Sequence, residues 1–156
     1  ARMTRSTRSK IEGGTGVPKH DVVGQLSRVP LFSGCSRRDL QTIARVVKDI
    51  DHANGTVIAR EGEPGVGLFV IVDGTADVTI GGKKKAALVP GDFFGEIALL
   101  DGGPRTATVT ATSDIQMLGL TEWVFRGLMQ EHPSIAVKTL QQMASRLRNA
   151  TKAATA

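Results

Sequence analysis

Aromatic residues and cysteine are scarce in this chain of 156 residues, and tyrosine is absent. Aromatic residues make up 4% of the sequence, so a ligand site must rely on aliphatic side chains, backbone groups and charges rather than on an aromatic cage. The single cysteine, Cys35, excludes a disulfide within the chain and fits a reducing compartment, so we expect a cytoplasmic protein. Nothing in its turn-like neighbourhood activates the thiol, and we interpret Cys35 as structural rather than catalytic.

Long apolar runs and clustered metal ligands are also lacking. No stretch approaches the ~20 apolar residues of a membrane helix, and the polar N-terminus shows no signal peptide. The three histidines, His20, His52 and His132, are dispersed, which argues against the metal centre of a cupin-type enzyme. Neither the spacing of a P-loop nor that of a Rossmann fingerprint occurs. We therefore expect no enzyme activity, no metal and no membrane segment.

The positive charge is concentrated at one end of the chain. The formal net charge is +5, and the first 20 residues hold five basic residues against one acidic residue. The remainder is nearly neutral, which argues against a nucleic-acid partner. Residues 1–19 are polar and lack an apolar period, which predicts a flexible basic leader; an anchoring role is the alternative.

Two kinds of pattern divide the rest into helical ends and a strand-rich middle. Helical spacing of apolar residues predicts helices over 21–28, 37–48, 121–131 and from 133 to about 148. Short apolar runs separated by glycine-rich turns predict strands over 56–58, 68–72, 76–80, 86–89, 106–111 and 115–120. Many short strands with close turns predict an α+β fold, in which an antiparallel β jelly roll (a double-stranded β-helix) is flanked by helices.

One segment departs from the strand-and-turn pattern. Residues 97–100 are apolar without alternation, which predicts a single helical turn whose unpaired N–H groups, just after Gly95, favour an anion. Arg105 follows a Gly-Gly-Pro turn that can return its guanidinium to the same point, and a cation beside free amides suits phosphate. Glu96 can accept a hydrogen bond from a hydroxyl beside that phosphate. A cyclic nucleotide offers this pairing, in its cyclic phosphate and ribose 2′-OH.

Two runs in this segment resemble a known family. Gly95–Leu100 (GEIALL) and Pro104–Val109 (PRTATV) are similar to the phosphate-binding cassette of cyclic-nucleotide-binding domains. These domains occur in catabolite activator protein, regulatory subunits of cAMP-dependent protein kinase, cGMP-dependent kinase and cyclic-nucleotide-gated channels. The resemblance extends over about residues 30–148 and includes Pro30-Leu31-Phe32 and residues 90–96. It implies a jelly roll with an N-terminal helix, a short phosphate-cassette helix and two C-terminal helices.

The resemblance also implies which residues bind the ligand. The residue matching Glu96 binds the ribose 2′-OH, and the one matching Arg105 binds the cyclic phosphate. Thr106 contacts phosphate or reaches the guanine amino group; a role in strand packing alone is the alternative. Backbone amides near Gly95 complete the cradle, and apolar side chains wall the pocket. The expected ligand-binding residues are Phe94, Gly95, Glu96, Ile97, Ala98, Arg105, Thr106, Ala107, Val70, Leu88 and Arg146.

Two positions depart from the family pattern. Val66 stands where the family often carries an acidic residue, and the last helix offers no aromatic lid over the base. The lid must then come from Met143, Leu147, Arg146 or Arg148, or be weak. The apolar stripe of this helix, at 136, 140, 143 and 147, suits core packing, an oligomer seam or a ligand lid.

The sequence therefore predicts a regulatory sensor rather than an enzyme. We expect a flexible leader over 1–19, a cyclic-nucleotide-binding domain over 20–150 and a disordered tail over 151–156. The expected ligand is cAMP or cGMP, with cAMP favoured, and binding is transmitted by movement of the C-terminal helices to an effector such as a channel, transporter, kinase or enzyme. The alternative is an interaction module, or a piece of a transcription regulator, without a ligand response of its own.

Overall fold

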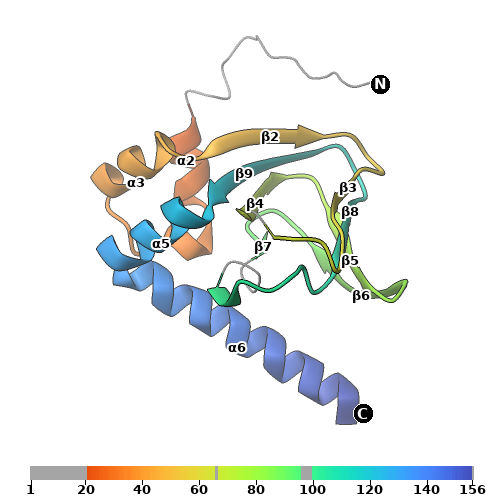
Figure 1. Cartoon of the computed structure of the whole chain (residues 1–156). Helices are drawn as coiled ribbons and strands as arrows, with labels where there is room; N and C mark the ends of the chain where they lie inside the picture. Colours follow the sequence, from red (N-terminus) through yellow and green to blue (C-terminus); the bar gives the residue numbers. More distant parts are fainter. Residues whose placement is uncertain (1–20, 66, 96–99, 156) are drawn as a thin grey trace.

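A computed structural model describes residues 21–65, 67–95 and 100–155 (Figure 1). The expected leader over 1–19 lies outside the described residues. In the described part, two four-stranded antiparallel sheets form a β sandwich, and helices gather at one end of it. None of the described helices is long and apolar enough to cross a membrane.

The strands form the two sheets of a jelly roll. One sheet has the order β2-β9-β4-β7 and the other β3-β8-β5-β6. The bounds of the strands are β2 Lys48–His52, β3 Val57–Ala59, β4 Gly67–Asp73, β5 Ala76–Ile80, β6 Lys83–Leu88, β7 Phe93–Phe94, β8 Thr108–Ala111 and β9 Ile115–Thr121. Non-consecutive strands lie side by side in both sheets, which is the mark of a jelly roll rather than of a simple meander. The predicted fold class is confirmed.

The helices close one end of the sandwich. They are α2 Val22–Ser27, the 3₁₀ helix η1 Pro30–Phe32, α3 Arg37–Ala44, α5 Glu122–Glu131 and α6 Pro133–Thr155. Ser36 caps α3 with a capping box shared with Asp39, and the Thr121 hydroxyl caps α5. A core of buried residues from α2, η1, α3 and α5 packs on strands β4 and β9, with Phe32, Ile43 and Phe125 at its centre. This packing fixes the helical end on the β4–β9 sheet.

The structure corrects the sequence analysis at three places. The helix expected over 37–48 ends at Ala44, because Lys48–His52 pair with Gly119–Ile115 as β2. Strand β7 was also missed, since its two residues are too few to show an alternating pattern. The tail expected to be disordered is helical through Thr155, because its alanine-rich sequence favours a helix and holds no breaker.

Candidate functional site

Backbone hydrogen bonds hold Arg105 against the turn that precedes β4. The Arg105 N–H donates to the carbonyl oxygen of Glu63 at 2.8 Å, and the Gly62 N–H donates to the carbonyl oxygen of Arg105 at 2.8 Å. Pro64 and Pro104 form an antiparallel bridge beside this pair. The main chain at Arg105 therefore has a fixed position, although it lies outside the named strands.

The side chain of Arg105 extends into the protein rather than into solvent. The residue is 8% exposed, although arginine rarely lies this deep. Its Nη2 donates a hydrogen bond of 3.1 Å to the carbonyl oxygen of Gly67, the first residue of β4. The guanidinium carbon lies 5.6 Å from the centre of the Phe69 ring, within the range of a cation–π contact. Phe69 in turn contacts Phe94 of β7, with ring centres 5.2 Å apart.

Gly95 allows the guanidinium to lie directly against the backbone that leads into the cassette. Its φ is +95°, a conformation that residues with a side chain rarely adopt. A Cβ at this position would overlap both the Arg105 guanidinium and the carbonyl oxygen of Gly67. The turn after β7 and the arginine thus meet at one point, which we call the cradle: Gly67, Phe69, Gly95 and Arg105.

The cradle offers the chemistry of an anion site. A guanidinium carries five donors in a planar fork that matches phosphate or carboxylate. The guanidinium is held here by the Gly67 carbonyl and the Phe69 ring, and the main chain of Arg105 is held by two hydrogen bonds, so little entropy is lost when the side chain binds a ligand. Glu96, Ile97 and Ala98, which the sequence places in the same site, lie outside the described residues.

The remaining expected site residues lie in two different settings. Phe94 and Leu88 are 6% exposed and belong to the core between the two sheets, and Val70 is fully buried in the core under the helices. Phe94 pairs in register with Phe69, which brings it to the cradle. Thr106 is exposed and Ala107 is half-buried, in the link between Arg105 and strand β8.

Arg146 connects helix α6 to the strand that precedes the cradle. Its Nη2 donates a hydrogen bond to the carbonyl oxygen of Phe93, and its guanidinium carbon lies 5.0 Å from the centre of the Phe93 ring. Phe93 is two residues before Gly95. Arg146 therefore contacts β7, the strand that leads into the cradle. Its side chain binds the carbonyl oxygen and the ring of Phe93 on that strand.

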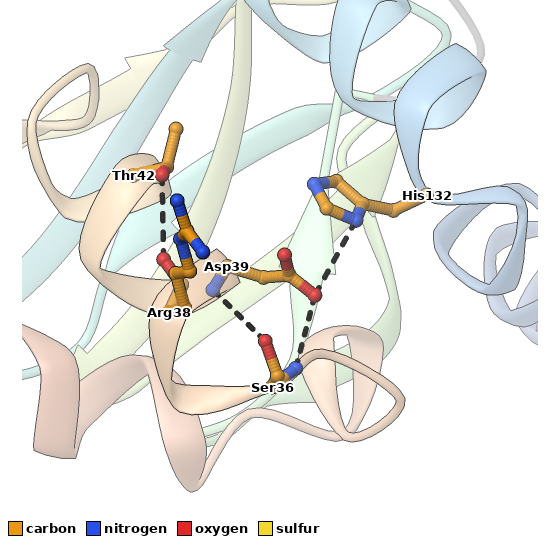
Figure 2. Close-up of polar contacts among 5 residues, drawn as sticks. All are labelled: Ser36, Arg38, Asp39, Thr42 and His132. Carbon is orange, nitrogen blue, oxygen red and sulfur yellow. Dashed lines mark hydrogen bonds and ion pairs between the residues drawn. The ribbon is translucent and has the colours of Figure 1, made fainter.

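The junction between α5 and α6 is linked to the start of α3 (Figure 2). His132 follows α5, and its Nδ1 lies 3.6 Å from Oδ2 of Asp39. The same carboxylate accepts a hydrogen bond of 3.1 Å from the Ser36 N–H. This backbone hydrogen bond, helped by the Ser36 hydroxyl and by nearby His132 and Arg38, holds the pKa of Asp39 below its usual value. His132, which the sequence left without a role, thus contacts the N-terminus of α3.

Three residues of the site were missed by the sequence analysis. Gly67 and Phe69 are two residues apart on β4 and so lie on the same face of the strand. Which face meets Arg105 is set by the pairing of β4 with β7. Phe93 belongs to a strand of two residues. The period-two spacing of Gly67 and Phe69 was the available signal, and it does not identify the arginine they would hold.

The other chemically reactive groups do not build a second centre in the part that is described. Burial raises the pKa of the Cys35 thiol, which keeps it protonated and unreactive. His52 lies at the opposite end of the sandwich beside Asp51 and Asp114, and burial lowers its pKa. Among the residues described, no group of three histidine, cysteine or acidic side chains is arranged to hold a metal ion.

Known proteins resemble this chain in both sequence and fold. The model of the "Cyclic nucleotide-binding domain" family matches residues 50–132. A "Cyclic nucleotide-gated potassium channel" of Mesorhizobium japonicum is 38% identical over 111 residues, which are 71% of this chain and 31% of the channel. A "CRP-like cAMP-activated global transcriptional regulator" of Mycobacterium tuberculosis is 28% identical over 130 residues, 79% of this chain and 57% of the regulator.

A solved structure gives the same result for the fold. "Sp-2Cl-cAMPS bound to PKAR CBD2" superposes with a TM-score of 0.73 at 27% identity, and the match covers 88% of this chain and 95% of that one. The chain spans about a third of the channel and just over half of the regulator, so it corresponds to one part of each. The family match covers more than half of the chain, includes the cradle and agrees with the jelly roll. The chain therefore belongs to the cyclic nucleotide-binding domain family.

Proposed function

We propose that this chain is a regulatory sensor that binds a cyclic nucleotide monophosphate, with cAMP favoured over cGMP, and transmits binding through its C-terminal helices. The observation that carries the proposal is the cradle. Its arginine is buried, and its guanidinium lies beside Gly95, aligned by Gly67 and Phe69. Its main chain is held by hydrogen bonds with Gly62 and Glu63. A singly charged cyclic phosphate suits one such guanidinium.

We assign the other groups of the ligand to residues around the cradle. Glu96 would accept a hydrogen bond from the ribose 2′-OH, and the backbone amides at Gly95, Ile97 and Ala98 would add donors to the phosphate. The relatives whose names include cAMP support cAMP as the ligand. Thr106 would favour cGMP only slightly, because one neutral hydrogen bond is worth about 0.5–1.5 kcal/mol.

The proposed output is a change in the position of α6. Strand β7 joins the cradle directly to this helix, because Phe93 is contacted by Arg146 and lies two residues before Gly95. A polar groove lined by Asp92 and Lys138, among others, separates the middle of α6 from the turn before β7, so this interface is not sealed by apolar packing. Ligand shifts the helix only as far as its affinity differs between the two positions.

The receiver of the signal is an effector domain or a separate protein. The relatives include a potassium channel and a transcription regulator, and the matched part of each is joined to other sequence. A channel, transporter, kinase or enzyme would each supply a surface that reads the position of α6. Neither nucleic acid nor a membrane is proposed as a direct partner of this domain.

Calorimetric titration with cAMP and cGMP tests the proposal. The wild-type chain should bind both, and Arg105→Ala should lower the affinity roughly 30- to 4000-fold, because loss of a partner to a desolvated charge costs about 2–5 kcal/mol. Arg45→Ala, which changes an exposed arginine at the end of α3, is the matched control and should bind like the wild type. If Arg105→Ala binds within threefold of the wild type, the phosphate is not held at the cradle.

A further inference from the structure

Helix α6 has an apolar face that points away from the protein. Val137, Leu140 and Leu147 are 51%, 64% and 69% exposed, and Ala144 between them is exposed as well. Their spacings of three, four and three residues place them in one stripe along the helix. We call these four residues the outer stripe.

The opposite side of α6 holds the helix on the domain. Ile135 and Thr139 are 0% and 1% exposed, and Arg146, further along the same side, contacts Phe93. Figure 1 shows α6 running along the outside of the molecule, with its C-terminal end away from the other helices. The outer stripe therefore lies on the side of α6 that faces away from these buried contacts.

The charge around the outer stripe has one sign. Residues 133–156 contain four basic residues and no aspartate or glutamate. Arg146 turns toward β7, whereas Arg148 is exposed and follows Leu147 at the edge of the outer stripe. A helix that packed here would place its own flanking residues beside Arg148, and carboxylates at those positions would match it.

A second copy of this chain fits the outer stripe less well. Two α6 helices packed stripe to stripe would bring the exposed Arg148 side chains of both copies to one seam, and residues 133–156 hold no carboxylate to offset them. Like charges at a helix interface oppose pairing, and flanking charges of helical seams decide partner choice. A membrane surface also fits less well, because the alternating three- and four-residue spacing makes a narrow seam rather than the wide apolar face of an interfacial helix.

We infer that the outer stripe of α6 is a docking surface for an amphipathic helix of an acidic partner protein. Leucine-type residues of the partner pack between Val137, Leu140 and Leu147, and its glutamates or aspartates flank the seam beside Arg148. This surface is distinct from the cradle and does not require bound nucleotide. Through this surface, an effector protein binds along α6.

Two designed 21-residue peptides test the inference on the full chain. Both carry leucine at the seam positions of a heptad; one has glutamate and the other lysine at the two flanking positions. Fluorescence anisotropy of labelled peptide should show at least tenfold tighter binding of the glutamate peptide. Leu140→Glu should weaken that binding at least tenfold, and Arg148→Glu should shift the preference toward the lysine peptide. Thr112→Glu, an exposed change on the loop after β8, is the control.

The other outcomes each overturn the inference. Equal binding of both peptides, or binding of neither, would exclude an acidic helix as the partner of the outer stripe. Sedimentation of the chain as a dimer that Leu140→Glu converts to monomer assigns the stripe to a second copy. Binding to phosphatidylglycerol vesicles that Leu140→Glu abolishes, without peptide binding, assigns it to a membrane surface. A circular dichroism spectrum identical to that of the wild type is required of every variant, and cAMP binding by Leu140→Glu separates this result from failure of the proposed function.

Discussion

The cradle and helix α6 are held in different ways. The cradle is fixed by main-chain hydrogen bonds of 2.8 Å between Arg105 and the turn at Gly62 and Glu63, and by a glycine that permits close contact. Helix α6 is buried at Ile135 and Thr139, and further along the helix a side chain, that of Arg146, attaches it to Phe93. Backbone contacts resist change, whereas one side-chain contact exchanges easily. In the proposed function, this difference fits binding at the cradle and movement of the helix.

After the loss of Arg105 itself, the largest effect should follow from adding a side chain inside the cradle. Gly95→Ala places a methyl group against the Arg105 guanidinium and the Gly67 carbonyl, at a φ of +95°. Strain of about 1–3 kcal/mol lowers cAMP affinity roughly 5- to 150-fold, measured by calorimetry. Gly55→Ala is the control, because its φ is +91° but no atom lies within 4 Å of the added Cβ. Equal cAMP affinity of Gly95→Ala and the wild type would mean that the cradle tolerates movement.

A smaller effect is expected from the ring beneath the guanidinium. Phe69→Leu keeps an apolar residue but removes the cation–π contact, which is worth about 0.5–2 kcal/mol. The affinity for cAMP should fall about 2- to 30-fold. Phe125→Leu, in the core under the helices, should lower the melting temperature and leave the affinity unchanged. If both variants lose affinity in proportion to their stability, Phe69 acts only through the fold.

The attachment of α6 should affect motion more than affinity. Arg146→Ala removes the hydrogen bond and ring contact to Phe93, so amides in the second half of α6 should exchange faster without ligand. Arg148→Ala changes an exposed arginine two residues further along the helix and should leave the exchange unchanged. Identical exchange in the two variants would show that α6 is held by something other than Arg146.

The smallest effect concerns acid stability at the start of α3. The pKa of Asp39 is lowered in the folded protein, so the unfolded chain binds protons more readily. The stabilisation is therefore complete above the ordinary value of 3.8 and is lost as the pH falls through the lower, folded value. Thermal melts from pH 5 to pH 2.5 should show a flatter decline for Asp39→Asn than for the wild type. Parallel declines would exclude a contribution of Asp39.

The sequence predicted features that depend on local pattern and missed those that depend on packing. Residues 76–80 alternate and form β5 with the expected bounds. Strand β2 was missed because Ile50 is the single strongly apolar residue in Lys48–His52, so its strand character comes from pairing with β9. Local pattern is sufficient where a segment buries one face by itself.

The same limit applies to the site and to α6. The cassette motif placed Arg105 beside Gly95, and the structure brings the two together. The roles of Gly67 and Phe69 come from strand pairing that no local spacing reveals. The apolar stripe expected on α6 includes Leu140 and Leu147, which are exposed, whereas Ile135 and Thr139 are buried. This helix carries apolar residues on several sides, and only packing selects the side that is buried.

Amide hydrogen exchange with and without saturating cAMP tests the division between cradle and helix most directly. Gly62 and Arg105 should exchange slowly in both states, because both amides donate hydrogen bonds of 2.8 Å. Protection should change at least fivefold along α6 from about residue 141 onward. Unchanged exchange throughout α6 at saturation, with cAMP bound, would mean that the helix does not respond to the ligand.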